Sequence, residues 1–153
     1  MKIIITGSLG NVAKPLAEQL IAEGHDITVI SSSESKKSEI ENLGAKAAIG
    51  SITDLNFLVE TFKGNDAAFL MTPPNMGFEN LVENTKNAGK NYAEAIQQTG
   101  VKRIVMLSSI GADSPVENGP IKGLHAIEKF YNELENTSVT FLRAGYFYIN
   151  FFN

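Results

Sequence analysis

A short glycine-containing turn near the start of the chain is the first segment whose residue types suit ligand binding. Gly7 and Gly10 stand between an apolar run typical of a strand and a segment with helical periodicity. The first glycine permits a tight turn, and the second lets the backbone approach an anion closely. The N–H groups and positive dipole end of the following helix then face that anion. The spacing G-x-x-G-x-x-A differs from the G-x-G-x-x-G fingerprint, but its place in the chain favours a dinucleotide pyrophosphate over a plain turn.

The residues after the second apolar run indicate which dinucleotide would bind. An acidic residue at this point binds the ribose 2′-hydroxyl of NAD, whereas a basic residue accommodates the 2′-phosphate of NADP. Three hydroxyl side chains stand here and two lysines follow shortly after: Ser31, Ser32, Ser33, Lys36 and Lys37. Because hydroxyl and ammonium groups suit a phosphate dianion, we expect NADP(H) to be favoured, with NAD(H) as the alternative. Glu34 weakens this argument, and a solvated loop whose lysines open a helix is the competing interpretation.

Three side chains are candidates for proton transfer or substrate polarisation. His125 and Lys129 are four residues apart in a helical segment, so they would share one face. An imidazole titrates near physiological pH and could donate a proton. Ser109, at the end of the fifth apolar run, could bond to a substrate carbonyl. The structural interpretations are a helix cap or a pairing with Glu128 for His125, and a turn for Ser109.

The bulk composition excludes several classes of protein. With 153 residues, 43% of them hydrophobic and 20% charged, the chain fits one globular domain. The net charge of -4 offers no footprint for nucleic acid. There is no cysteine, which excludes thiolate chemistry, and we expect no metal site. The sequence also contains no P-loop motif, signal peptide or membrane-spanning apolar run, so we expect a cytoplasmic protein without membrane contact.

Strand-like and helix-like segments alternate along the chain. Apolar runs typical of buried parallel strands lie at 2–6, 26–31, 45–49, 66–71, 101–108 and 138–143. Helical periodicity is found at about 11–23, 36–43, 54–63, 78–99 and 123–135. Pro15 indicates that the first helix starts late or bends. The pattern predicts one α/β domain over residues 1–153, with helices on both faces of a doubly wound (Rossmann) parallel sheet of strand order 3-2-1-4-5-6.

Three blocks of sequence carry a resemblance to a known family. They are Thr6-Gly7-Ser8-Leu9-Gly10-Asn11, Leu107-Ser108-Ser109-Ile110-Gly111-Ala112, and Leu124-His125-Ala126-Ile127-Glu128 with Thr140-Phe141-Leu142-Arg143-Ala144-Gly145-Tyr146-Phe147 and Asn150. Together they resemble the NmrA-like group of atypical short-chain dehydrogenases, which includes NAD(P)H-dependent quinone reductases. The resemblance covers essentially the whole chain.

The resemblance implies a set of cofactor-binding residues. The pyrophosphate would lie against the turn formed by Gly7, Ser8, Leu9, Gly10, Asn11 and Val12. The adenosine ribose would meet Ser31, Ser32 and Ser33, with Lys37 nearby for the 2′-phosphate. The adenine would be flanked by Ser51 and Ile52, and the nicotinamide half would lie beside Met71, Thr72, Pro73 and Pro74.

Several positions depart from the family pattern. Ser51 stands where relatives usually carry Asp, Ala144 replaces a Pro, and Ile149 replaces an acid. Short-chain dehydrogenases also protonate a carbonyl with a Tyr followed by Lys four residues later. None of the four tyrosines, Tyr92, Tyr131, Tyr146 and Tyr148, has a lysine at that spacing.

Two functions are therefore compatible with the sequence. The first is an NADPH-dependent reductase of quinones or similar electrophiles, since a quinone can accept hydride and take protons from water. The alternative is a non-catalytic dinucleotide-binding redox sensor, which fits the missing Tyr–Lys pair.

The chain ends in a dense aromatic run from Tyr146 to Phe152. The resemblance implies that relatives continue into a substrate-covering C-terminal part, which is absent here. One interpretation is that the aromatic side chains fold back onto the sheet. The alternative is that they pack against this missing C-terminal part, or form an interface in a homo-oligomer or with a protein partner. The aromatic run is also suited to stacking on a flat substrate.

Overall fold

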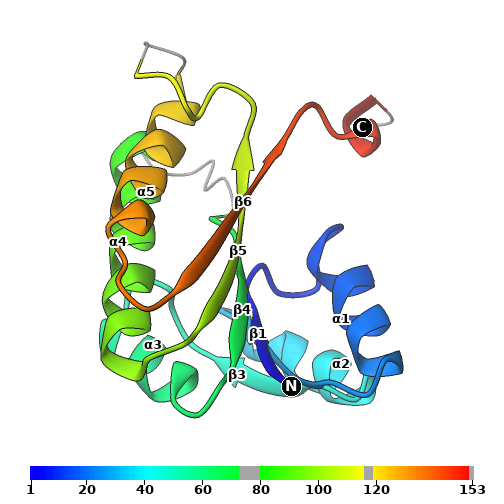
Figure 1. The fold of residues 1–153 in the computed structure, drawn as a ribbon. Helices are drawn as coiled ribbons and strands as arrows, with labels where there is room; N and C mark the ends of the chain where they lie inside the picture. The colour runs from blue at the N-terminus through cyan, green and yellow to red at the C-terminus, as the bar shows by residue number, and fades with distance from the viewer. Residues whose placement is uncertain (73–79, 116–118, 152–153) are drawn as a thin grey trace.

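A central parallel sheet lies between two layers of helices (Figure 1). The computed structural model describes residues 1–72, 80–115 and 119–151. The strands are β1 (Lys2–Ile5), β2 (Asp26–Ser31), β3 (Lys46–Ile49), β4 (Ala67–Leu70), β5 (Arg103–Ser109) and β6 (Ser138–Ala144). The α-helices are α1 (Ala13–Ala22), α2 (Lys37–Asn42), α3 (Leu55–Phe62), α4 (Leu81–Thr99) and α5 (Ile121–Asn132), and the 3-10 helices are η1 (Glu34–Lys36) and η2 (Tyr148–Phe151).

The strand order is β3-β2-β1-β4-β5-β6, and every neighbouring pair is parallel. This confirms the fold class and strand order that the sequence predicts. The order reverses between β1 and β4, where Ile4 pairs with Ala68. In sheets of this type, ligands bind in the crevice outside the carboxyl ends of the strands at that point of reversal. The fold therefore directs attention to the residues that follow Ile5 and Leu70.

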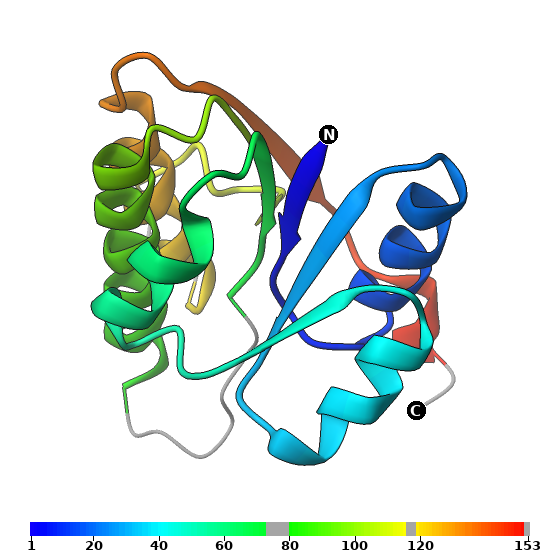
Figure 2. The ribbon, with the colours of Figure 1, turned by 90° about the horizontal axis from the view of Figure 1, so that it is seen from below.

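Each face of the sheet has its own apolar core. Helices α1 and α2 cover one face and α3, α4 and α5 cover the other, as the two perpendicular views agree (Figures 1 and 2). Because side chains alternate along a strand, Ile3 and Ile5 belong to the core under α1 and α2. Ile4 points the other way and packs in the core with Phe62 and Ile127. Burial on both faces explains the continuous apolar runs in the sequence.

Element boundaries lie within three residues of the sequence expectation, and those of β2 agree with it at both ends. The glycine turn extends through Asn11, so α1 begins only at Ala13 and holds Pro15 in its first turn, where a proline is tolerated. This confirms the late start that Pro15 indicates. Asp54 accepts a hydrogen bond from the Phe57 N–H at 3.2 Å and caps α3, as expected. The 3-10 helix η1 before α2 was not predicted.

The aromatic side chains near the end of the described chain do not fold back into the core. Tyr146, Tyr148 and Phe151 are 67%, 85% and 69% exposed. Their rings contact one another, with the centroids of Tyr146 and Phe151 4.9 Å apart and those of Tyr148 and Phe151 6.4 Å apart. Helix η2 lies on the same side of the sheet as α1 (Figures 1 and 2).

Helices α4 and α5 approach closely because small residues lie at their contact. A Cβ atom added at Gly89 would lie 2.2 Å from Ile127 Cγ1, and one added at Gly123 would lie 2.8 Å from Thr85 Cβ. Ile127 is fully buried and β-branched, so it has little freedom to move aside. The positions of the side chains that α4 and α5 turn toward the carboxyl edge of the sheet depend on this contact.

Replacing Gly89 with alanine should destabilise the fold although alanine is the better helix former. The gain in helix propensity is about 0.5–1 kcal/mol, whereas overpacking costs about 1–3 kcal/mol. We expect a net loss of about 1 kcal/mol and a midpoint of thermal unfolding lowered by roughly 2–4 °C, measured by circular dichroism. The control Lys90→Ala changes the exposed neighbour and should leave the midpoint nearly unchanged. A Gly89→Ala protein as stable as the control would contradict close packing at this contact.

Candidate functional site

The turn between β1 and α1 has a backbone shape that few residues adopt. Gly7 has φ +98° and Ser8 has φ +55°. A Cβ atom at Gly7 would lie 2.4 Å from the sulfur of Met71, the residue that follows β4. The positive φ therefore requires glycine at position 7, and a Cβ atom there would also displace the flexible Met71 side chain.

The amide groups that follow this turn are left without protein acceptors. Within the described residues, no acceptor binds the N–H groups of Leu9, Asn11, Val12 or Ala13. No side chain caps α1, and its first turn carries no acidic residue. By contrast, Asp54 and Asn80 cap α3 and α4. The start of α1 is thus an array of free donors at the positive end of a helix dipole, the arrangement that binds phosphate.

Hydroxyl side chains tie this turn to the neighbouring strands. Ser8 donates to the Ser31 hydroxyl oxygen at 3.0 Å, and the Ser33 N–H donates to the same oxygen at 3.2 Å. On the other side, the buried Thr6 hydroxyl oxygen accepts the Met71 N–H at 2.7 Å. The carboxyl ends of β1, β2 and β4 are held together by these bonds.

A cavity of about 700 Å³ opens beside the turn. Its walls include Gly7 and Ser8 from the turn, Ser31 and Ser32 from the end of β2, and the loop 50–53 after β3. No described lining residue carries a charged side chain. A neutral wall rich in hydroxyl and amide groups suits a nucleoside better than a phosphate group.

Helix α4 supplies the opposite wall with residues that sequence reasoning missed. Asn84, Asn87 and Asn91 line the cavity from one face of the helix, at three- and four-residue steps. Asn91 Nδ2 donates to the Ile52 carbonyl oxygen at 3.3 Å and so joins α4 to the loop after β3. The buried Tyr92 donates to the Met71 carbonyl oxygen at 3.2 Å, and burial raises the pKa of its hydroxyl. The helical spacing of the three asparagines in the sequence could have indicated this polar wall.

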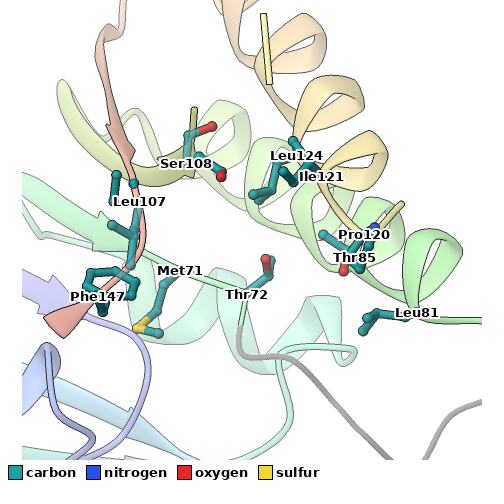
Figure 3. Close-up of a pocket in the computed structure, with 13 residues that line it drawn as sticks. Met71, Thr72, Leu81, Thr85, Leu107, Ser108, Pro120, Ile121, Leu124 and Phe147 are labelled. Atoms are coloured by element: carbon teal, nitrogen blue, oxygen red, sulfur yellow. The ribbon is translucent and has the colours of Figure 1, made fainter. Parts of the chain in front are cut away.

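A second cavity, of about 250 Å³, lies between β4, β5, β6, α4 and α5 (Figure 3). Its wall is mostly apolar, with Met71, Leu107 and Phe147 gathered on one side and Ile121 and Leu124 on the other. The polar lining side chains are Thr72, Thr85, Ser108 and Ser109. No described lining residue has an acidic or basic side chain.

The two cavities share part of their walls. Thr72, Leu81 and Thr85 line both of them. The shared wall places a polar, larger compartment next to an apolar, smaller one along the carboxyl edge of the sheet. An elongated ligand with chemically different ends fits such an arrangement.

An ion pair adjoins the wall of the smaller cavity through Ser108, with the Glu128 carboxylate buried and the Arg143 side chain 41% exposed. Arg143 donates to Glu128 twice, from Nε to Oε1 at 3.0 Å and from Nη2 to Oε2 at 2.7 Å. The Ser108 hydroxyl donates to Glu128 Oε1 at 2.6 Å. Burial alone raises the pKa of Glu128, but the hydrogen bonds from Arg143 and Ser108 outweigh it, and the net pKa is lowered. Glu128 is therefore an ionised anchor, and the hydroxyl proton of Ser108 is directed to it and away from the cavity.

Of the three candidate catalytic residues, one lines a cavity and two do not. Ser109 lines the smaller cavity, and its hydroxyl donates to the Ile110 carbonyl oxygen at 3.2 Å. His125 Nδ1 lies 2.7 Å from the Ala112 carbonyl oxygen, so this nitrogen carries the proton and donates. Neither His125 nor the exposed Lys129 is among the described lining residues of the two cavities.

The expected cofactor-binding residues are brought together in part. Gly7, Ser8, Ser31, Ser32, Ser51, Ile52 and Thr72 line the larger cavity, and Met71 and Thr72 line the smaller one. Leu9, Gly10, Asn11 and Val12 continue the turn outside the lining of either cavity, as do Ser33 and Lys37 after β2. Lys36 and Lys37 lie 2.8 Å and 4.0 Å from Glu39 and Glu34, respectively. Pro73 and Pro74 lie outside the described residues.

Two further findings concern the described part of the chain. It contains no group of three or more His, Cys, Asp or Glu side chains placed to hold a metal ion. None of the helices described there combines the length and hydropathy that crossing a membrane requires.

Solved structures share this fold at low sequence identity. The Citrobacter sp. triphenylmethane reductase complexed with NADP(H) superimposes with a TM-score of 0.83 at 21% identity, over 100% of this chain and 52% of that one. An NADPH-dependent quinone oxidoreductase from Escherichia coli gives 0.76 at 22% identity, over 97% and 49%. The yeast methylglyoxal/isovaleraldehyde reductase complexed with NADPH gives 0.78 at 16% identity, over 95% and 58%. The chain thus spans about half the length of these proteins.

A family model described as NAD(P)H-binding matches residues 7–144, from the first glycine of the turn to the end of β6. No curated protein sequence is similar enough to add to this comparison. The match includes the β1–α1 turn and the strand ends around both cavities, which confirms the nucleotide-binding assignment made from the sequence. The chain belongs to the NAD(P)H-binding family.

Proposed function

We propose that this chain is the cofactor-binding part of an NADPH-dependent reductase of quinones or similar uncharged electrophiles, of the NmrA-like type. The observation that carries the proposal is the pair of cavities that meet at Thr72, Leu81 and Thr85 beside the open amides of α1. The larger, hydrogen-bonding cavity suits the adenosine half of the cofactor. The smaller, apolar cavity suits the nicotinamide and a flat acceptor. The pyrophosphate between them would bind the free amides of Leu9, Asn11, Val12 and Ala13.

The chemistry of the smaller cavity supports a quinone as acceptor. Bound NADPH supplies a hydride to the acceptor. Ser108 directs its proton to Glu128, and no described residue of the lining has an acidic or basic side chain. A quinone needs no protein acid, because after gaining the hydride it takes a proton from water to become the hydroquinone. The chain's role is to orient the two rings, with Met71 and Phe147 as apolar contacts.

Support for NADPH over NADH comes from the segment after β2. This segment has Ser31 and Ser32 at the cavity and Lys36 and Lys37 in the helical turns that follow. The lysines are half-exposed and their carboxylate partners are also on the surface, so these ion pairs are weak and can exchange for a 2′-phosphate. Triphenylmethane reductase, which shares the fold, is complexed with NADP(H).

The reductase activity is tested by following NADPH oxidation at its absorbance maximum with a panel of quinones. We expect turnover with uncharged quinones by the protein that contains this chain and its natural continuation. Tight NADPH binding without turnover of any quinone in the panel would support the alternative, a redox sensor. Failure to bind NADPH would contradict both functions.

Replacing Gly7 with alanine should weaken NADPH binding by about tenfold or more. The added Cβ would collide with Met71 and distort the turn that presents the amides, and one lost charge-assisted hydrogen bond accounts for about a factor of ten. The measurement is isothermal titration calorimetry. Gly24→Ala is the matched control, because Gly24 also has positive φ (+84°) but has no atom within 4 Å of the added Cβ. Equal affinities in the two variants would rule out the assigned pyrophosphate site.

Replacing Lys37 with alanine should lower the affinity for NADPH by roughly three- to tenfold, since a cation near the 2′-phosphate is lost. The affinity for NADH should stay the same, because NADH lacks that phosphate. Titrations of both cofactors measure the ratio. Lys46→Ala removes an exposed lysine paired with Asp26 on β2 and serves as the control. A wild-type protein that binds NADH more tightly than NADPH would overturn the assigned preference.

A further inference from the structure

The hydroxyl groups of the loop after β3 form hydrogen bonds within the loop itself. The hydroxyls of Ser51 and Thr53 bond to each other at 2.7 Å, and Ser51 Oγ also accepts the Thr53 N–H at 3.1 Å. Through these two bonds Ser51 stabilises the loop. The hydroxyl groups of this loop are therefore already engaged, which leaves recognition of a base in the larger cavity to the loop backbone and to the opposite wall.

Asn91 on α4 is oriented for that task. The partner of its Nδ2 atom is the Ile52 carbonyl oxygen, at 3.3 Å. A carbonyl oxygen only accepts, so the amide nitrogen must face it, and this fixes which end of the side-chain amide is oxygen. Oδ1 has no donor among the described residues, although Asn91 is half-buried and lines the cavity. The second Nδ2 hydrogen is also available, which leaves one acceptor and one donor in a single plane.

We propose that Asn91 reads the adenine base of the bound dinucleotide, a proposal that rests on the assignment of the larger cavity to adenosine. Oδ1 accepts a hydrogen bond from the N6 amino group, and Nδ2 donates to a neighbouring ring nitrogen. Asparagine makes the same two bonds to the N6 and N7 atoms of adenine in protein–DNA recognition. The neutral lining fits an uncharged base, and the Ile52 carbonyl holds the amide in place. Asn91 is thus a residue that sets specificity for adenine.

The probe for this proposal is reduced nicotinamide hypoxanthine dinucleotide phosphate, in which a carbonyl oxygen replaces the N6 amino group of NADPH. Oδ1 would then face an acceptor in place of a donor. We expect the wild-type chain to bind this analogue about tenfold more weakly than NADPH, measured by calorimetry, a factor typical of one hydrogen bond lost with its acceptor left buried.

Asn91→Ala should weaken NADPH binding about three- to tenfold and bring the affinities for the two dinucleotides close to equal. The variant also removes the bond to Ile52, but that loss weakens both ligands alike and does not change their ratio. Alanine is a better helix former than asparagine, so α4 should stay folded, which circular dichroism verifies. Gln98→Ala, on an exposed position of the same helix, should keep the wild-type ratio.

Two results would overturn the proposal. Equal affinity of the wild-type chain for both dinucleotides would do so without any variant, and so would an unchanged ratio in Asn91→Ala. In either case NADPH still binds, so the proposed function survives. If the wild-type chain bound neither dinucleotide, both the adenine assignment and the proposed function would fail.

Discussion

Free amide groups at the start of α1 are the feature on which the rest of the site depends. A helix leaves its first N–H groups without intrahelical partners, and proteins usually satisfy some of them with a side-chain cap, as Asp54 does for α3. Here α1 has no such cap, and no acidic residue lies in its first turn. The described chain leaves an uncompensated cluster of donors at the point where the strand order reverses. An anion bound there supplies the missing hydrogen-bond acceptors. A bound pyrophosphate is therefore held by the amides and in turn stabilises the conformation of the turn.

The remaining contacts hold the surroundings of that turn in place. Thr6 bonds to the backbone of Met71, and Ser8 bonds to Ser31, so the ends of three strands keep fixed distances from the amides. On the far side of the sheet, Gly89 allows α5 to pack against α4, which brings the walls of the smaller cavity together. The ion pair between the buried Glu128 and the half-exposed Arg143 joins α5 to β6. A ligand that spans both cavities would therefore meet a largely preformed site.

The parts of the structure that the sequence predicted are those set by local patterns. Strands buried on both faces produce continuous apolar runs, and a glycine turn between strand and helix is recognisable from neighbouring residues alone. The partners of Glu128 were not predictable in this way. Sequence spacing suggested His125, three residues earlier, whereas the actual partners are Ser108 and Arg143, 20 and 15 residues away. Similarly, the meeting of Asn91 with Ile52 joins positions 39 residues apart. Such contacts depend on how side chains from segments far apart in the sequence pack against one another, which no local pattern encodes.

The most direct measurement is a titration of the ¹⁵N-labelled chain with NADPH, followed through the backbone amide signals in NMR spectra. Saturating NADPH should shift the amide signals of Leu9, Asn11, Val12 and Ala13 most strongly, because their N–H groups gain a charged acceptor that the described protein does not provide. Unchanged signals for these four residues, with shifts elsewhere or with none, would show that the turn does not bind the diphosphate.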